Sequence, residues 1–491
     1  VKHEQKRLQH EFDDEPETII ADARYAFIGG ALKETLKPGQ SKKWETVNII
    51  DAFLLNKIFA FPVFLGFMWL MFYSTFFVGQ YPMEWIEAGV SYLSNFLNQM
   101  MTDGMLKDLI VDGIVGGVGG VIVFLPNILI LFFFISLMED TGYMARVAFI
   151  MDKLMHKMGL HGRSFIPLLM GFGCNVPAIM STRTIENRND RLLTMLINPF
   201  MSCSARLPVY LLIIGAFFPD HPGTVLFSIY AIGIILAVLV AILFKKTLFK
   251  SEDSPFVMEL PPYRVPTMRN SVKHMWFKTR QYLQKMGGII LVASIIIWAL
   301  SYFPRDVEFS KNYEVQIAQK EQIISLEVNK EIIEDYQYQL ITLKKEKAAE
   351  LQEKSYLGML GKAVEPVMKP LGFDWKMSVS LIAGASAKEI VVSTLGVLYQ
   401  ADPDEEAEIL QKRLQEETYK FGPNKGQKVF DPIVAFAFLI FVLIYFPCIA
   451  TVAAIKKESG SWKWAIFMMS YTTGLAWLLA FLVNQIGHLI F

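Results

Sequence analysis

The chain has 491 residues, of which 53% are hydrophobic, 13% aromatic and only 19% charged. Its 47 basic side chains balance 47 acidic ones, so no basic excess is left to neutralise phosphates, which argues against a nucleic-acid-binding protein. The sequence also contains neither an HExxH nor a GxSxG motif, which argues against a membrane hydrolase. This composition predicts an all-α, polytopic membrane protein.

Residues 1–45 are charged and polar, and the stretch 14–36 has the acidic start that is typical of a helix, with Gly29-Gly30 interrupting it. We expect a cytoplasmic helical segment and linker that form the end of a soluble domain. The first residue is Val and no signal-peptide pattern follows it, so the chain fits the later part of a longer polypeptide.

Apolar runs of the roughly 20 residues that a membrane-spanning helix needs recur along the rest of the chain. We expect about seven spans, at 58–78, 113–138, 192–218, 225–244, 287–303, 432–454 and 464–486. Two further apolar segments, 165–185 and 377–399, are interrupted by glycine, proline, polar or charged residues. Irregular backbone at membrane depth is tolerated where it is packed in protein or lines a cavity, so we expect these segments to be re-entrant gate hairpins.

These segments predict two membrane halves, 46–250 and 286–491, joined by a cytoplasmic loop at 251–285. The second half contains a charge-rich insertion at 305–356, in which Leu326, Ile333 and Leu340 are spaced as in a long amphipathic helix or a helical hairpin. Basic residues follow the second span, the fourth span and the sixth span. The positive-inside rule therefore predicts that these three stretches are cytoplasmic and that the insertion and the C-terminus lie outside.

The two hairpins can be aligned on Ser181-Thr182 and Ser393-Thr394, which pairs Gly173-Cys174 with Ala385-Ser386. Paired, interrupted segments in two halves indicate a pseudo-symmetric inverted repeat around a transporter's binding site. Small residues at the hairpin tips allow close backbone approach. The residues expected to form the gates and their turns are Gly171, Gly173, Asn175, Pro177, Gly384, Ser386 and Lys388.

The three cysteines of the chain, Cys174, Cys203 and Cys448, all lie in or beside apolar segments, and none belongs to a CxxC pair. Thiolates are soft ligands that suit a transition metal, and Asn175 or a carbonyl freed near Pro177 can complete a coordination shell. The alternative interpretation is that each cysteine is a small apolar residue in a packed helix.

Acidic residues at membrane depth are costly and therefore point to function. Glu389 lies in the middle of the second hairpin, and we expect it on an ion path; the alternatives are an internal pair with Lys388 or a helix cap. Glu139 and Asp140 end the second span, where they either attract cations at the cytoplasmic exit or cap the next helix. Arg206, inside the third span, is expected to snorkel or to pair with an acid.

Four strings resemble the membrane region of the ferrous iron transport protein B (FeoB) family with its two gate segments: GFGCNVPAIMSTRTIENRNDRLLT, NPFMSCSARLPVY, AGASAKEIVVSTLGVLY and FPCIATVAAIKKESGSWKWAIF. The resemblance covers nearly the whole chain, and DARYAFI at 22–28 resembles the end of that family's helical domain. The sequence departs from the family in one respect, because it contains no GxxxxGK[ST] phosphate loop of the family's G domain.

This resemblance implies Fe²⁺ transport across the inner (cytoplasmic) membrane, with metal contacts at Cys174 and Cys203 and with Cys448 as a lesser candidate, beside the carboxylate of Glu389. It implies that the chain itself is no enzyme, and that GTP and Mg²⁺ bind only to a G domain on the preceding polypeptide or on a separate chain. Other expected partners are the lipid bilayer and a small accessory iron-transport protein, and the resemblance leaves a homo-oligomer open.

Three alternatives remain from the residues themselves. Ligand types do not fix metal selectivity, so another divalent metal is one alternative. The gate segments are also reminiscent of concentrative nucleoside transporters, and in a carrier of nucleosides or other small polar solutes the cysteines would be incidental. A scaffold for the G domain is disfavoured, because a scaffold needs no charged, broken segments inside the bilayer.

Overall fold

The computed structural model is helical almost throughout the residues that it describes, and the one β-bridge in this part of the chain joins Thr418 to Lys428. The described residues are 23–28, 30–31, 50–54, 56, 59–102, 104–116, 119, 122–123, 125–249, 262–305, 307–326, 330–399, 407–418, 426 and 428–490. Most of the expected N-terminal segment 1–45 lies outside these residues, and its described pieces, 23–28 and 30–31, are helical.

Four helical segments of the described chain are long and apolar enough to cross a membrane: Arg188–Phe217, Pro222–Thr247 (α14), Pro432–Ser459 and Trp462–Ile490 (α24). A fifth is a bent pair, α8 (Leu125–Asp140) and α9 (Tyr143–Lys157), whose axes meet at 86°. The bend falls at Gly142, whose φ of 79° is a conformation that glycine adopts easily. These helices confirm a multi-pass, all-α membrane protein.

Two shorter apolar helices coincide with the first and fifth expected spans. They are α4 (Ala60–Tyr73), which continues through a π-helical turn η1 (Ser74–Val78) into α5 (Gly79–Met100), and the part Leu291–Tyr302 of α15 (Met268–Tyr302). The expected cytoplasmic loop at 251–285 is helical from Met268 onward, where 268–285 contains no glycine or proline and forms the first half of α15, and its assignment to the cytoplasm stays a prediction. The count of seven spans stays a prediction.

The second expected span, 113–138, is helical at every residue that the structure describes there. Its described residues lie in a π-helical stretch η2 (Leu109–Gly116), which follows α6 (Met105–Asp108), at 119 and 122–123, and in α8, which begins at Leu125.

Both expected hairpins are confirmed as pairs of short helices. The first consists of α10 (Phe165–Gly171), after η3 (Gly162–Ser164), and α11 (Asn175–Ser181), which ends in η4 (Thr182–Thr184). The second consists of α19 (Trp375–Ala383) and α20 (Ile390–Leu398). The second hairpin begins at Asp374, whose carboxylate accepts a hydrogen bond from the Met377 amide at 2.8 Å and caps α19.

Two segments that hydropathy predicts as continuous spans are broken as well. The first break separates α12 (Arg188–Ile197) and η5 (Asn198–Phe200) from η6 (Ser204–Arg206) and α13 (Leu207–Phe217). The second separates α22 (Pro432–Ile444) from α23 (Ile449–Ser459). Short non-helical stretches at 201–203 and 446–448 separate the parts of the two broken helices, and they contain Cys203 and Cys448. Pro199 and Pro447 lack the amide that a continuous helix requires at these places.

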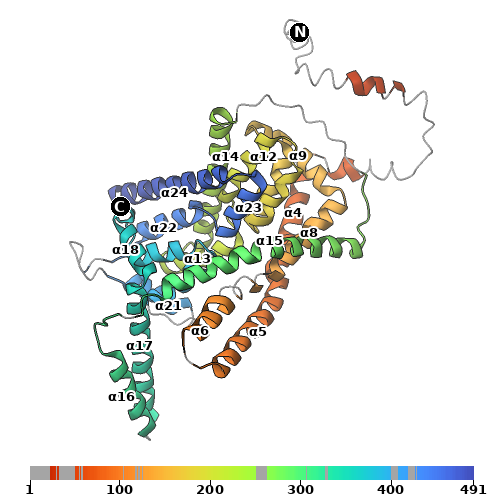
Figure 1. Cartoon of the computed structure of the whole chain (residues 1–491). Coiled ribbons are helices and arrows are strands. Elements are labelled where there is room, and N and C mark those ends of the chain that lie inside the picture. Colours follow the sequence, from red (N-terminus) through yellow and green to blue (C-terminus); the bar gives the residue numbers. More distant parts are fainter. Residues whose placement is uncertain are drawn as a thin grey trace.

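The hairpins and the broken helices pack against each other across the two halves. The second arm of the first hairpin, α11, packs on α23, and the second arm of the second hairpin, α20, packs on α13. In Figure 1 the yellow-green helices of the first half and the blue helices of the second half accordingly share one central bundle. The four breaks are therefore brought to the same region of the molecule.

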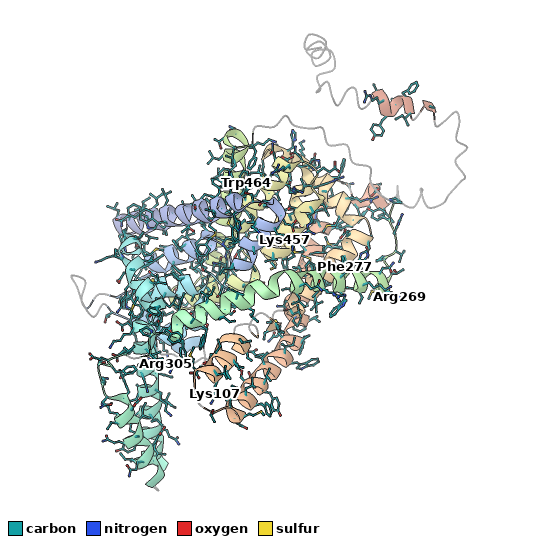
Figure 2. The ribbon with its side chains drawn as sticks, viewed as in Figure 1. Lys107, Arg269, Phe277, Arg305, Lys457 and Trp464 are labelled. Carbon is teal, nitrogen blue, oxygen red and sulfur yellow. The ribbon has the colours of Figure 1, made fainter. Side chains whose placement is uncertain are left out.

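The three basic stretches gather at one end of this bundle. Lys245, at the end of α14, lies 3.7 Å from the Asp190 carboxylate at the start of α12, and Arg183 of η4 forms a two-pronged ion pair with Glu458 of α23. Arg269 lies at the start of α15, and Arg305 follows the other end of this helix, which leads to the insertion. Figure 2 shows Arg305 and Lys107 far from Arg269. The basic stretches thus share one end, as expected, and the side of the membrane on which it lies stays a prediction.

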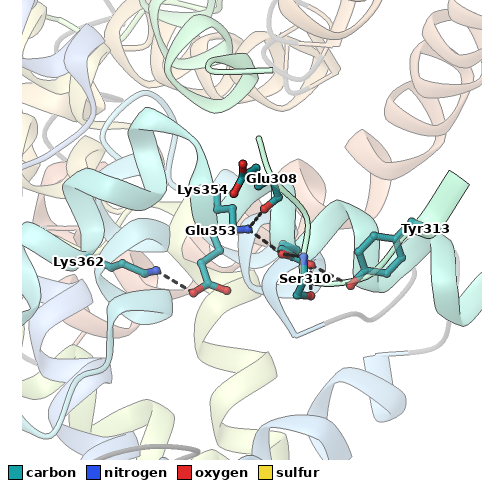
Figure 3. A network of polar contacts seen from close by, with 7 residues as sticks. Glu308, Ser310, Tyr313, Glu353, Lys354 and Lys362 are labelled. Atoms are coloured by element: carbon teal, nitrogen blue, oxygen red, sulfur yellow. Dashed lines mark hydrogen bonds and ion pairs between the residues drawn. The ribbon is translucent and has the colours of Figure 1, made fainter. Parts of the chain in front are cut away.

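The insertion is a helical hairpin of α16 (Tyr313–Leu326) and α17 (Lys330–Lys354), which extends away from the bundle (Figure 1). Figure 3 shows the polar network at its base, where Ser310 donates to Glu350 from both its amide and its hydroxyl at 2.7 Å, and Tyr313 donates at 2.9 Å. Burial raises the pKa of Glu350, but these bonds and the Lys354 ammonium outweigh it and lower that pKa to about 2.

The chain leaves the insertion through α18 (Tyr356–Met368) and η7 (Lys369–Leu371), and α21 (Ala407–Glu416) follows the second hairpin. The end of α24 packs on this region, since Asn484 donates to the Pro370 carbonyl at 3.1 Å. The end of α24 therefore lies on the insertion's side of the bundle, as the predicted topology requires.

Candidate functional site

One cavity of about 110 Å³ lies where the four helix breaks meet. All three cysteines line it, together with Glu389 and Lys388 of the second hairpin. The first hairpin contributes Gly173, Cys174 and Asn175, the first broken helix contributes 203–206, the second hairpin contributes 386–389, and the second broken helix contributes Pro447, Cys448, Ala450 and Thr451. The structure thus brings together cysteines that the sequence places up to 274 positions apart, and it closes the remaining wall with α8 and η1.

Each cysteine lies directly before the start of a helix. Cys174 precedes α11, Cys203 precedes η6, and Cys448 precedes α23. The amides at a helix start carry partial positive charge and stabilise an anion beside them. All three thiols are free and partly exposed to the cavity. A buried thiolate is costly alone and becomes stable when a cation binds beside it, so the arrangement suits a cation that arrives and leaves.

The two halves make the same hydrogen bond at their breaks. The Gly173 carbonyl accepts from the amide of Ser204 at 3.2 Å, and the Ala385 carbonyl accepts from the amide of Ile449 at 2.8 Å. Ser204 directly follows Cys203 and Ile449 directly follows Cys448, while Gly173 and Ala385 are the residues that the sequence alignment pairs. The structure therefore supports the internal repeat. The inverted orientation of the halves stays a prediction.

The repeat also makes Cys448 as strong a candidate for metal contact as Cys203. By this correspondence Cys448 is the counterpart of Cys203, and it lines the same cavity. Its Sγ lies 3.3 Å from the Thr451 hydroxyl one helical turn later. We therefore treat the three cysteines as equivalent candidates for metal contact.

Glycines at the hairpin tips allow the close approaches that the sequence predicts. A Cβ at Gly171 would lie 2.8 Å from the Met201 side chain, and a Cβ at Gly173 would lie 2.6 Å from Leu131. At Gly384 a Cβ would lie 2.3 Å from a methyl group of Val391. These distances are too short for any larger residue without a shift of its neighbours.

Glu389 lines the cavity, and both local alternatives for it were wrong. It precedes α20 but makes no side-chain capping hydrogen bond. Among the interactions of the described chain, no ion pair joins it to Lys388, whose ammonium instead donates to the Phe446 carbonyl at 2.8 Å. A carboxylate in this position is available for a cation.

Neutral oxygens of the cavity were only partly foreseen. The side-chain oxygens of Asn175 and Asn127 are both buried, and neither has a hydrogen-bond partner in the described structure. Asn175 was a candidate, whereas Asn127 and Thr451 were missed. The spacing of Thr451, three residues after Cys448 and so on the same helix face, could have indicated it as a further oxygen ligand. No local pattern in the sequence indicates Asn127.

Arg206 also lines the cavity, and the expectation that it snorkels or pairs with an acid was wrong. Its side chain is fully buried, and its Nη1 donates to the Pro199 carbonyl at 3.1 Å. The break in the first broken helix frees that carbonyl, so the backbone takes the role expected of an acid.

Glu139 and Asp140 do not join the cysteine cavity. Asp140 accepts a hydrogen bond from Ser271 at 2.9 Å and lies 3.5 Å from His274. The capping alternative was wrong, because α9 begins after Gly142 with no side-chain cap. Glu139 lines a second cavity of about 430 Å³ at the basic end, with Pro177 and other residues of α11. Helix α11 therefore borders both cavities.

The donors of the cysteine cavity do not form a ready-made metal cluster. Within the described residues, no three His, Cys, Asp or Glu side chains lie close enough to hold a metal ion together. The donors on offer are a mixed set of thiols, one carboxylate, amide oxygens and freed carbonyls. Such a set suits a cation that is passed along rather than one that is held permanently.

Three family models match parts of the chain. The gate model, described as nucleoside recognition, matches residues 121–217 and 283–462. The model of the ferrous iron transport protein B C terminus matches 226–278, and the model of the FeoB cytosolic helical domain matches 1–37. No solved structure matches the chain.

Several curated proteins are similar over most of the chain. An Fe(2+) transport protein A/Fe(2+) transporter FeoB fusion protein of Porphyromonas gingivalis is 59% identical over 97% of the chain and 56% of its own length. The Fe(2+) transporters FeoB of Campylobacter jejuni and Methanocaldococcus jannaschii are 43% and 38% identical, over 90% and 97% of the chain and 65% and 64% of their own lengths. The chain thus spans less than two thirds of the length of each of these relatives.

Proposed function

Because the chain belongs to the ferrous iron transport protein B family and corresponds to its membrane region, we propose that it forms the permease through which Fe²⁺ crosses the cytoplasmic (inner) membrane. The observation that carries this proposal is the cavity at the four helix breaks, which gathers Cys174, Cys203, Cys448 and Glu389. Fe²⁺ accepts thiolate, carboxylate and carbonyl ligands, and this cavity offers all three kinds.

In this proposal the first hairpin is the gate toward the basic end. Its second arm, α11, has Cys174 of the cysteine cavity before its start and lines the second cavity with Pro177. A shift of α11 joins the two cavities, and Glu139 then attracts the cation at the exit. The ion pair of Arg183 with Glu458 fastens the end of this arm to α23 and holds the gate closed.

The proposed domains and partners rest on the same family membership. We assign residues 1–45 to the end of a cytoplasmic helical domain, which passes the state of a GTP-binding domain to the membrane halves. GTP and Mg²⁺ belong to that domain and not to the cavity. The relative from P. gingivalis carries Fe(2+) transport protein A in its name, which supports a small accessory iron-transport protein as a further partner.

The rival function is the carriage of a nucleoside, which the description of the gate model favours. The two functions differ in what they ask of the cavity. A nucleoside needs hydrogen bonds and a stacking surface and has no use for thiols, whereas Fe²⁺ uses all three cysteines. Removing the thiols therefore separates the two functions.

The test is uptake into liposomes that contain the purified chain and an Fe²⁺-quenched dye, under anaerobic conditions. We expect saturable Fe²⁺ uptake above that of empty liposomes, no uptake of radiolabelled uridine, and loss of Fe²⁺ uptake in the C174S/C203S double variant. Uridine uptake that survives in the double variant, without Fe²⁺ uptake by the parent, would establish the rival function.

A further inference from the structure

The buried Lys388 ammonium occupies a place that is built for a cation. Its Nζ donates to the Phe446 carbonyl at 2.8 Å and lies 3.2 Å from the centre of the Tyr445 ring. The Phe446 ring lies on a further side, at 5.4 Å. Lys388 is only 2% exposed, so water does not compete for these contacts.

The carbonyl and the aromatic rings around the Lys388 ammonium belong to a different segment of the chain from Lys388 itself. Tyr445 and Phe446 lie in the break between α22 and α23, directly before Pro447 and Cys448, whereas Lys388 comes from the second hairpin. A carbonyl freed at membrane depth and the face of an aromatic ring both bind cations. The second broken helix therefore supplies a cation site beside Cys448, and the hairpin fills it with its own ammonium.

The charges of the cavity make this ammonium and a metal ion mutually exclusive. Among the residues that line the cavity, Lys388 and Arg206 are basic and Glu389 is acidic, so basic side chains outnumber carboxylates there. A divalent cation beside Cys448 would be repelled by the ammonium at short range, in surroundings that screen charges poorly.

The internal repeat shows that the lysine is a feature of one half only. In the alignment of the hairpins, the counterpart of Lys388 is Val176, a buried apolar residue at the start of α11. The break beside Cys203 therefore receives no charge from its hairpin, and Arg206 reaches the Pro199 carbonyl from within the same broken helix.

Resting on the proposed function, we propose that the Lys388 ammonium is a tethered cation that occupies the cargo position beside Cys448 and must leave it before Fe²⁺ binds there. The flexible four-carbon stem lets the ammonium withdraw without movement of the backbone. Lys388 thus sets the affinity of the cavity for its cargo and keeps the empty cavity closed to other cations.

The test compares three variants in the liposome assay and in equilibrium Fe²⁺ binding to the detergent-solubilised chain. K388M and K388Q remove the charge, and the glutamine amide can still donate to Phe446, which preserves the fold if the hydrogen bond is needed. We expect both to lower the half-saturating Fe²⁺ concentration at least tenfold. K376M is the matched control, since Lys376 of the same hairpin lies 4.3 Å from the Tyr399 ring but does not line the cavity.

The outcomes separate this inference from the proposed function. If the parent takes up no Fe²⁺, the proposed function fails. If the parent takes up Fe²⁺ and the folded K388M and K388Q proteins bind it no more tightly than the parent does, the tethered-cation inference is wrong. Weaker binding in the neutral variants would also overturn it, because the lysine would then support the site. Tighter binding in K376M as well would assign the effect to general charge removal and overturn it too.

Discussion

Cys174, Cys203 and Cys448 each occupy the position before a helix start, which makes serine a conservative substitute there. Serine is favoured at this position and keeps the size of cysteine, but it lacks the soft sulfur ligand. We expect each Cys→Ser variant to lower Fe²⁺ uptake at least tenfold while its thermal unfolding temperature stays within a few degrees of the parent's. Parental uptake in the C174S/C203S variant would rule out a two-thiol contact.

The role of the Glu389 charge can be tested apart from that of the side chain's shape, because glutamine has nearly the same shape and no charge. Its side chain makes no capping bond, so Glu389→Gln is expected to fold normally and to lose most Fe²⁺ uptake, because the carboxylate that balances the cation is gone. Glu353→Gln is a suitable control, since Glu353 pairs with Lys362 outside the cavity at 2.7 Å. A folded Glu389→Gln protein with parental uptake would remove Glu389 from the ion path.

At the scale of elements, the hairpin tips depend on the absence of a side chain. At Gly384 a Cβ would lie 2.3 Å from Val391 and 2.8 Å from the Tyr445 hydroxyl, so G384A forces apart the arms of the second hairpin. We expect a loss of stability of about 1–3 kcal/mol, as for overpacked cores, measured by thermal unfolding in detergent. G474A is the control, because nothing lies within 4 Å of a Cβ at Gly474 of α24, and it should be neutral.

The base of the insertion has a pH dependence of predictable sign. The pKa of Glu350 is lowered to about 2 in the folded chain, so its contribution to stability is complete above its ordinary pKa, near 4.5, and is lost as the pH falls from there toward 2. The unfolding temperature of the parent should exceed that of Glu350→Gln by a constant margin above pH 5, and the margin should shrink toward pH 2. A margin that grows in acid would contradict this assignment.

The sequence predicts a helix break where glycine, proline, polar or charged residues interrupt an apolar run. The hairpins are readable because Gly-Cys-Asn-Val-Pro and Lys388-Glu389 interrupt apolar runs in their middles. The breaks at Cys203 and Cys448 are hidden, since the flanking residues are apolar enough for hydropathy to join them into one span. The contact of Lys388 with Phe446 crosses 58 positions and leaves no local pattern.

At the scale of the molecule, the shared end of the basic stretches and the opposite position of the insertion make a topology test direct. In a background with the three native cysteines replaced by serine, a cysteine introduced at Glu321 of α16 should react with a membrane-impermeant maleimide from outside. A cysteine at Lys457 should react only after the membrane is permeabilised. The reverse pattern would reject the predicted orientation and the re-entrant assignment of the hairpins.

The claim that joins all three scales is that four helix breaks form one cation site with thiol ligands. X-ray absorption at the iron edge, on the anaerobic chain loaded with one equivalent of Fe²⁺, tests it most directly. We expect a sulfur shell at about 2.3 Å, the distance that thiolates keep from Zn²⁺, and its loss in the C174S/C203S/C448S variant. A first shell of oxygen and nitrogen alone, or a sulfur shell that persists in the triple variant, would contradict the account.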